Sequence, residues 1–133
     1  MDIVLVDTDI VSFIFKGDNR VQPYTPFLKE KILAVSFMTV AELFQWAAVR
    51  NWGVKRIKQL EDTLNNYLML PCDIELCRRW GKVRANRRKA GHPISPQDAW
   101  VAATALRYEI PIATYNLQDF KRVEGLKLIR PDN

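Results

Sequence analysis

Short apolar runs alternate with longer segments of helical periodicity along this chain. The runs at 3–6, 32–35 and 110–114 are typical of buried strands, and those at 68–71 and 126–129 predict weaker ones. Apolar residues at helical spacing predict helices over 10–15, 24–31, 39–49, 54–68, 73–89 and 96–108. Because strands and helices alternate, we expect an α/β fold with a central parallel sheet of about four to five strands and helices on both faces.

The length and composition fit one compact unit. With 133 residues, of which 48% are hydrophobic, the chain can bury one core, so we expect a single domain over residues 1–133. No apolar run approaches the roughly 20 residues of a membrane span, and Met1-Asp2 opens without a basic leader segment. We therefore expect a cytoplasmic protein with no membrane partner. Cys72 and Cys77 lack zinc-site spacing, and we expect both to be reduced core residues.

Polar side chains with metal-binding chemistry follow the predicted strands. Asp7 ends the first strand, Glu42 and Asp98 lie in what we expect to be the first turns of two helices, and Asn116 and Asp119 follow the strand at 110–114. The carboxyl ends of parallel strands meet at one edge of a sheet, so these residues can converge there. Close carboxylates repel one another unless a cation neutralises them, and Mg²⁺ prefers oxygen ligands.

Each of these acids also has a purely structural interpretation. Thr39-x-x-Glu42 and Ser95-Pro96-Gln97-Asp98 fit helix-start patterns, in which the acid reaches back to the cap. Asp119 fits a solvated loop acid. Only their joint occurrence at the strand ends favours a pocket. Other chemistries have little support, because His92 is the single histidine and the chain has neither a Gly-x-Ser-x-Gly elbow nor a glycine-rich phosphate loop.

Four segments together resemble the PIN-domain ribonucleases, and among them the VapC-type toxins of toxin–antitoxin pairs. The resemblance covers nearly the whole chain and keeps the order and spacing of the motifs. The segments are Val6-Asp7-Thr8-Asp9-Ile10-Val11-Ser12, Val40-Ala41-Glu42-Leu43, Gly91-His92-Pro93-Ile94 leading to Asp98 and Ala102-Ala103, and Ile112-Ala113-Thr114-Tyr115-Asn116 with Asp119-Phe120.

The resemblance implies an endoribonuclease that depends on Mg²⁺ or Mn²⁺, forms a homodimer and is inhibited by an antitoxin protein. Asp7, Glu42 and Asp98 match the acids of the family, while Asn116 stands where many relatives have a fourth acid. We expect Asp7 and Asp98 to bind the metal and Glu42 to bind it or orient the attacking water. Asn116 and Asp119 would complete a second position. The groups expected to fix these ligands are Thr8, Asp9, Ser12 and Thr114.

The positive charge of the chain is consistent with an RNA substrate. The formal net charge is +5, and basic residues are dense in the helix expected over 73–89. We expect Arg84 and Arg87 to contact the RNA backbone, since basic groups near a cleavage site position phosphates. The outward-facing basic residues of the same helix are equally compatible with a solvated surface.

Two other functions stay open at this point. The segment Asp7-Thr8-Asp9 after an apolar strand also resembles the first motif of haloacid-dehalogenase phosphatases, in which Asp7 would be the nucleophile. Asn116 in place of an acid also keeps open a catalytically silent PIN module that binds RNA or a protein.

Overall fold

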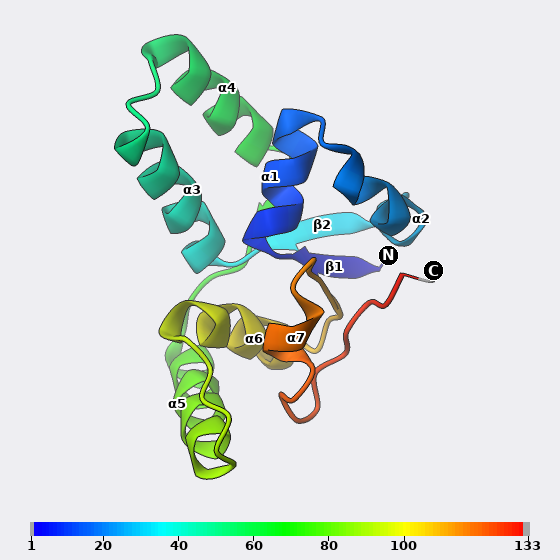
Figure 1. The fold of residues 1–133 in the computed structure, drawn as a ribbon, viewed down its shortest axis with the longest axis vertical. Coiled ribbons are helices and arrows are strands. Elements are labelled where there is room, and N and C mark those ends of the chain that lie inside the picture. The colour runs from blue at the N-terminus through cyan, green and yellow to red at the C-terminus, as the bar shows by residue number, and fades with distance from the viewer. Residues whose placement is uncertain (1, 132–133) are drawn as a thin grey trace.

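A four-stranded parallel sheet forms the centre of the molecule (Figure 1). The computed structural model describes residues 2–131. The strands lie in the order β3-β2-β1-β4 and all pairs are parallel, as predicted. Leu128 forms a single parallel bridge to Ile112, so the weak strand expected over 126–129 is reduced to one contact at the sheet edge. The bounds of the strands are Ile3–Val6 (β1), Ile32–Val35 (β2), Leu68–Met69 (β3) and Ile112–Ala113 (β4).

Helices connect the strands and cover both faces of the sheet, which confirms the predicted fold class. The long helices α5 and α6 pack side by side below the sheet in Figure 1, and α3 and α4 lie above it. None of the helices within residues 2–131 is long and apolar enough to cross a membrane. Their bounds are Thr8–Lys16 (α1), Asn19–Tyr24 (the 3₁₀ helix η1), Thr25–Leu28 (α2), Phe37–Val49 (α3), Val54–Leu64 (α4), Ile74–Lys89 (α5), Pro96–Tyr108 (α6) and Leu117–Phe120 (α7).

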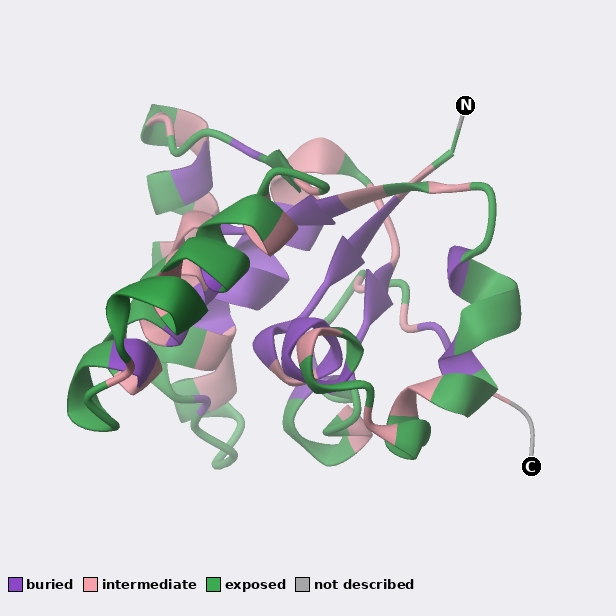
Figure 2. Cartoon of the chain, turned by 90° about the horizontal axis from the view of Figure 1, so that it is seen from above, coloured by how far each residue is buried: buried purple, intermediate pink, exposed green. Residues whose placement is uncertain are grey.

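The pleat of β1 divides the apolar core into two layers. Val4 and Val6 point to one face, where they pack with residues of α1, α3 and α4. Leu5 points to the other face and packs with α5, α6 and α7, including the alanines of α6. Figure 2 shows the buried strands and the inner sides of the helices between exposed outer surfaces. Burial on both faces explains why β1 is apolar throughout.

Local chemistry sets the helix boundaries, and several differ from the sequence prediction. The helix expected over 54–68 ends at Leu64, because the chain turns so that Leu68 can join the sheet as β3. The helix expected over 24–31 is the short α2 preceded by η1. The first predicted helix starts at Thr8 and ends before Gly17, whose positive φ of 67° suits glycine. Helix α7 was not predicted, and it has only four residues.

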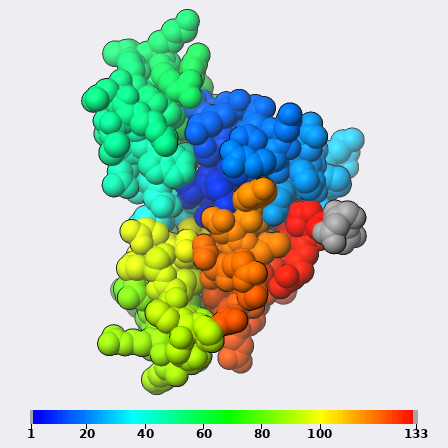
Figure 3. Space-filling view, in the orientation of Figure 1, coloured from blue at the N-terminus to red at the C-terminus, as the bar shows by residue number. Residues whose placement is uncertain are grey.

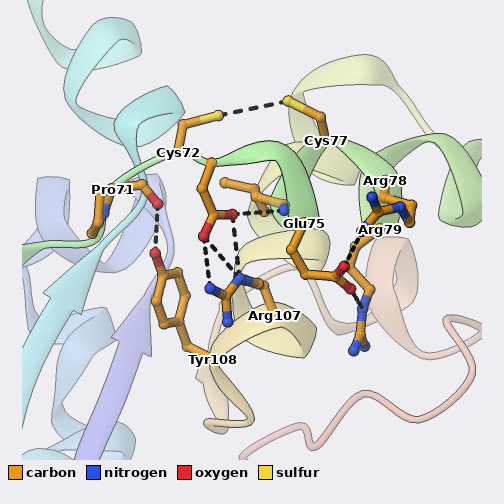
Figure 4. Close-up of polar contacts among 10 residues, drawn as sticks. Pro71, Cys72, Glu75, Cys77, Arg78, Arg79, Arg107 and Tyr108 are labelled. Atoms are coloured by element: carbon orange, nitrogen blue, oxygen red, sulfur yellow. Dashed lines mark hydrogen bonds and ion pairs between the residues drawn. The ribbon is translucent and has the colours of Figure 1, made fainter.

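The start of α5 is fixed to α6 by polar contacts (Figure 4). Asp73 caps α5 by accepting from the Leu76 backbone N–H at 2.8 Å, and it pairs with Arg107 of α6, with Nη2 and Oδ2 2.6 Å apart. The Tyr108 hydroxyl donates to the Pro71 carbonyl at 2.6 Å. This junction holds the N-terminal end of α5 against the C-terminal end of α6.

The prediction that the two cysteines belong to the core is wrong. Cys72 and Cys77 are both exposed, and their sulfur atoms lie 3.9 Å apart (Figure 4). They flank the Asp73 cap, one just before it and one in the first turns of α5, which are the positions that side chains use for contact across a helix start. The pair therefore covers the start of α5 rather than filling the space beneath it.

Candidate functional site

The carboxyl ends of β1 and β4 bring Asp7 against Thr114. The strand register pairs Val6 with Ala113, and the Asp7 backbone N–H donates to the Ala113 carbonyl at 2.9 Å. The Thr114 hydroxyl donates to Asp7 Oδ2 at 2.8 Å. Two neighbouring strands, distant in sequence, thus place an acid and its hydroxyl donor together at the expected edge of the sheet.

Asp7 is a buried acid with an unfavourable environment for its charge. Only 6% of the residue is exposed, and its Oδ1 accepts from the Thr8 backbone N–H at 2.8 Å, so Asp7 also caps α1. Burial, followed by the negative charge of Asp9, raises the pKa of Asp7 to about 7. The bonds from Thr114 and Thr8 oppose this rise, and the charge of Asp98 adds to it. A nearby cation would favour the ionised form.

Glu42 reaches the same region from α3, and its helix-cap interpretation is wrong. Ser36 caps α3 by accepting from the Thr39 backbone N–H at 3.1 Å, so Glu42 lies beyond the first turn in which the sequence analysis placed it. The Thr8 hydroxyl donates to Glu42 Oε1 at 2.8 Å and lies 2.9 Å from Thr39 Oγ1. These threonines hold the carboxylate of Glu42 toward β1.

Asp98 is part of a helix cap and of the acidic region at the same time. It is the third residue of α6, and its backbone N–H donates to the Ser95 hydroxyl at 3.0 Å, which confirms the predicted helix start. Burial and then the charge of Asp119 raise the pKa of Asp98, and the charges of Glu42 and Asp9 contribute further. The carboxyl group of Asp98 therefore interacts with the charges of acids from α1, α3 and α7.

Asp9 is held by backbone N–H groups of two segments. Its Oδ1 accepts from Ile10 at 2.7 Å, and its Oδ2 accepts from Tyr115 at 3.1 Å. Burial raises the pKa of Asp9 against these bonds, and the charge of Asp119 adds to the rise. Asp9 thus joins the start of α1 to the segment after β4. Ser12 is buried one turn further along α1, on the same side as Asp9.

The structure gives Asn116 and Asp119 different places. Asn116 is exposed just before α7, and its backbone N–H donates to the Thr114 hydroxyl at 3.1 Å. Asp119 lies within α7 and raises the pKa of both Asp9 and Asp98 through its charge. Of the two residues, Asp119 is therefore the one that brings a negative charge to the other acids.

The acids come from separate segments that meet on one face of the molecule. Figure 3 shows the dark blue segment after β1, the yellow start of α6 and the orange segment around α7 next to one another. The ion pairs within residues 2–131 join other residues. No Lys, Arg or His nitrogen in this range lies within 4 Å of a carboxylate oxygen of this group. We call this group the acidic site, and its members are Asp7, Asp9, Glu42, Asp98 and Asp119.

The acidic site offers the donor atoms of a hard divalent cation but not a ready cluster of ligands. In the part of the chain that the structure describes, no three His, Cys, Asp or Glu side chains lie close enough together to hold a metal ion. Burial and then the charges of neighbouring acids raise the pKa of Asp7 and Asp98, so a bound cation would stabilise their ionised forms. The residues fit Mg²⁺ or Mn²⁺ in kind, and side-chain movement would be needed to bind either ion.

The two arginines predicted to contact RNA have partners within the protein. Arg87 donates from Nε to the His92 carbonyl at 3.1 Å and from Nη1 to the Arg122 carbonyl at 2.9 Å. The Arg84 guanidinium lies over the ring of Trp80, 5.5 Å from its centre. Arg87 therefore joins the loop before α6 to the segment after α7, a role that its position in sequence did not indicate.

Two contributors to the site were missed by the sequence analysis. Thr39 is fully buried beside Thr8, and Tyr24 donates from its hydroxyl to the Thr114 carbonyl at 2.7 Å. Both act on the predicted residues from distant segments. Thr39 carried a signal, since it precedes Glu42 by one turn, but Tyr24 lies 90 positions from Thr114 and no local pattern connects them.

Comparison with known proteins decides between the families considered. The model of the PIN domain family matches residues 4–126. The chain belongs to the PIN domain family. This assignment confirms the resemblance drawn from the motifs, and it replaces the haloacid-dehalogenase interpretation of Asp7.

Individual PIN proteins match over nearly their full length. Ribonuclease VapC1 of Haemophilus influenzae is 27% identical over 94% of this chain and 95% of that protein. The structure of VapBC-1 from nontypeable Haemophilus influenzae superposes with a TM-score of 0.81 at 26% identity, covering 96% of both chains. VapBC2 from Rickettsia felis, bound to a DNA fragment from its promoter, gives a TM-score of 0.85 at 21% identity and covers 98% of this chain and 99% of that one. The last comparison supports the fold alone.

Proposed function

We propose that this protein is an endoribonuclease toxin that hydrolyses RNA phosphodiester bonds with Mg²⁺ or Mn²⁺ and is inhibited by a cognate antitoxin. The observation that carries the proposal is the acidic site, in which acids of four separate segments influence one another and, within residues 2–131, no Lys, Arg or His side chain pairs with them. Similarity to a VapC ribonuclease and to VapBC structures supports the reaction class and the antitoxin partner.

Asp7 and Asp98 would hold the metal, with Asp119 and Asn116 at a second position. When bound, the ion supplies a bound water of lowered pKa and offsets the charge that develops on the phosphate. Thr114 and the Thr8 backbone N–H fix the carboxylate of Asp7, so it is already oriented by two bonds. Asp9, held by Ile10 and Tyr115, keeps the segment after β4 in place beside Asp7.

Glu42 is the group that we assign to the attacking water. The Thr8 hydroxyl holds its Oε1, which leaves Oε2 to accept a hydrogen bond from that water. The water oxygen forms a new bond to phosphorus and gives a proton to Glu42 Oε2, while the bond from phosphorus to the leaving oxygen of the RNA breaks and that oxygen takes up a proton from solvent. The silent PIN module is the alternative that this assignment has to exclude.

Cleavage of a 5′-labelled structured RNA tests the proposal. The wild-type protein should cut in Mg²⁺ or Mn²⁺ and stop in EDTA. Glu42→Gln keeps an oxygen for the Thr8 hydroxyl and removes the charge, so it should cut at least about 100-fold more slowly. Asp62→Asn, in an exposed ion pair of α4, is the matched control and should cut at the wild-type rate. RNA binding without metal-dependent cleavage would instead identify a silent module.

The homodimer and the cytoplasmic location are also part of the proposal. The homodimer comes from the resemblance to VapC-type toxins, and the cytoplasmic location is the expectation drawn from the short apolar runs of the sequence. Light scattering of the purified protein should give twice the mass of one chain, and addition of the cognate antitoxin should abolish cleavage. A monomer that is fully active would contradict the dimer.

A further inference from the structure

A groove of about 490 Å³ adjoins the acidic site and contains charges of both signs. Asp98 and Asp119 line it together with His92, Lys121 and Arg122. Lys121 and Arg122 are exposed and follow α7 directly. Within residues 2–131, neither has a carboxylate oxygen within 4 Å of its side-chain nitrogens. The groove therefore places two exposed cations, Lys121 and Arg122, beside two acids of the acidic site, and Arg87 lines it as well.

Arg87 holds the two sides of this groove together. Its bonds to the His92 and Arg122 carbonyls connect the loop before α6 with the segment after α7. The Arg122 guanidinium also contacts His92 Nδ1, so a second link runs between the same two segments. Arg87 thus shapes the groove with two of its nitrogens, whereas the exposed Lys121 lines the groove without such a link among the described residues.

A second cavity continues the positive lining away from the acidic site. It has a volume of about 680 Å³ and shares Arg87 and Arg122 with the groove. Its cations outnumber the acids Glu109 and Glu124, and they are Arg79, Lys82, Arg87, Arg122 and Lys127. Within residues 2–131, Arg87 Nη2 is the buried side-chain polar atom that has no hydrogen-bond partner. That atom is itself inaccessible, so Arg87 contributes to the lining through the two carbonyl groups that it binds.

We propose that the groove and the cavity form a track for the RNA backbone, in which Lys121 and Arg122 bind the phosphates next to the one that is cut. The inference rests on the proposed function. The arrangement of charges in the groove supports the proposal. Its carboxylates suit a metal at the phosphate that is cut, and the cations next to them suit the neighbouring phosphates. Lys121 and Arg122 are exposed at the groove, whereas the Arg84 guanidinium stacks on Trp80 and Arg87 uses two of its nitrogens to bind carbonyl groups.

The salt dependence of RNA binding distinguishes the loss of direct phosphate contacts from the general loss of positive charge in a variant. Anisotropy of a fluorescent single-stranded RNA, measured in EDTA to prevent cleavage, gives the dissociation constant at several salt concentrations. For Lys121→Ala/Arg122→Ala we expect affinity about 10-fold lower and a salt slope smaller by about 1.4, since each phosphate contact contributes about 0.7 for single strands. The control Lys29→Ala/Lys55→Ala removes the same charge from exposed residues near the opposite layer, and its slope should equal that of the wild type.

Cleavage kinetics distinguish a failure of this inference from a failure of the proposed function. The double variant should raise KM and keep kcat within about threefold, because it weakens binding outside the acidic site. If the wild type cleaves RNA while the double variant keeps its affinity and salt slope, the track is overturned and the nuclease stands. If the wild type neither binds nor cleaves RNA, both are overturned. Thermal melting should give the same Tm for both double variants and the wild type.

Discussion

The molecule contains two groups of acids, and they differ in their partners. At the α5–α6 junction, Arg107 lowers the pKa of Asp73 to about 2, and Arg79 and Arg78 lower the pKa of Glu75 (Figure 4). In the acidic site, burial and neighbouring acids raise the pKa of Asp7, Asp9 and Asp98. The junction acids stabilise the folded chain in their charged form, whereas those of the acidic site destabilise it. Perturbed acids without cations are typical of functional sites.

The comparison explains why the same residue type has opposite roles in one small domain. Asp73 and Asp98 lie at the starts of consecutive helices, and both contribute to a helix start. Asp73 meets a guanidinium of α6, while Asp98 meets Asp119, Glu42 and Asp9. Capping therefore does not distinguish a structural acid from a functional one. The charges around it do.

The largest expected effect comes from removing one acid from each group. Asp98→Asn should reduce RNA cleavage by about 100-fold or more, because it removes a metal ligand from the proposed site. Asp73→Asn should leave cleavage within about threefold and lower the Tm by a few degrees, because it weakens the cap of α5 and its pair with Arg107. Cleavage assays and melting curves of both variants check the pair. Equal losses of cleavage would contradict the division into two groups.

The next effect is the pH dependence of stability that Asp7 produces. In the unfolded chain Asp7 loses its proton near its ordinary pKa of 3.8, but in the folded protein it keeps the proton until about pH 7. The folded state thus binds more protons between these values, so the free energy of unfolding should fall as the pH rises from about 4 to 7 and level off above. At 1.36 kcal/mol per pKa unit, the fall is on the order of 4 kcal/mol. Urea unfolding at a series of pH values measures it.

Two results would oppose this assignment of the pH dependence. The fall should be much smaller in Asp7→Asn, which cannot titrate at this position. A wild-type stability that rises steadily between pH 4 and 7 would show that Asp7 is stabilised in its charged form. An unchanged slope in the variant would assign the titration to other groups.

The smallest of the three effects is stabilisation by the metal itself. At a Mg²⁺ concentration ten times its dissociation constant, binding to the folded state contributes about 1.4 kcal/mol, which corresponds to a Tm increase of about 4 °C. Asp98→Asn should lose this increase, while Asp73→Asn should keep it. Calorimetric melting with Mg²⁺ and with EDTA measures the difference. An equal increase in Asp98→Asn would place the ion away from the acidic site.

The sequence contained enough to predict the sheet and the place of the acids. The apolar run at 3–6 is buried from Val4 onward and the run at 32–35 is buried at Ala34 and Val35, and their composition identifies both as strands of the sheet. The acid that directly follows the run at 3–6 is Asp7, and it lies at the predicted carboxyl edge of the sheet. The position of Glu42 was less accurate, because Ser36 and Thr39 both fit a helix cap and only the bond between them shows which one serves.

Contacts between distant segments could not be predicted. The edge strand β3 is exposed and has only two residues, so strand propensity alone does not predict it. Helix α4 ends at Leu64 because the residues that follow pair with β2. The hydrogen bonds of Arg87 could not be predicted, because the carbonyl groups that it binds belong to loops whose paths depend on α6 and α7. The exposed cysteines were misjudged from average burial, since their actual environment is the surface at the start of α5.

The central claim is that the acids of the acidic site serve function at the expense of stability, and Asp7→Asn tests it most directly. The variant keeps an oxygen for the Thr8 N–H and removes a charge that burial disfavours. Measured on one preparation at pH 8 without metal, its Tm should lie several degrees above that of the wild type. In Mg²⁺, its cleavage of RNA should be lost. A variant that melts lower than the wild type, or that still cleaves RNA, would contradict the account.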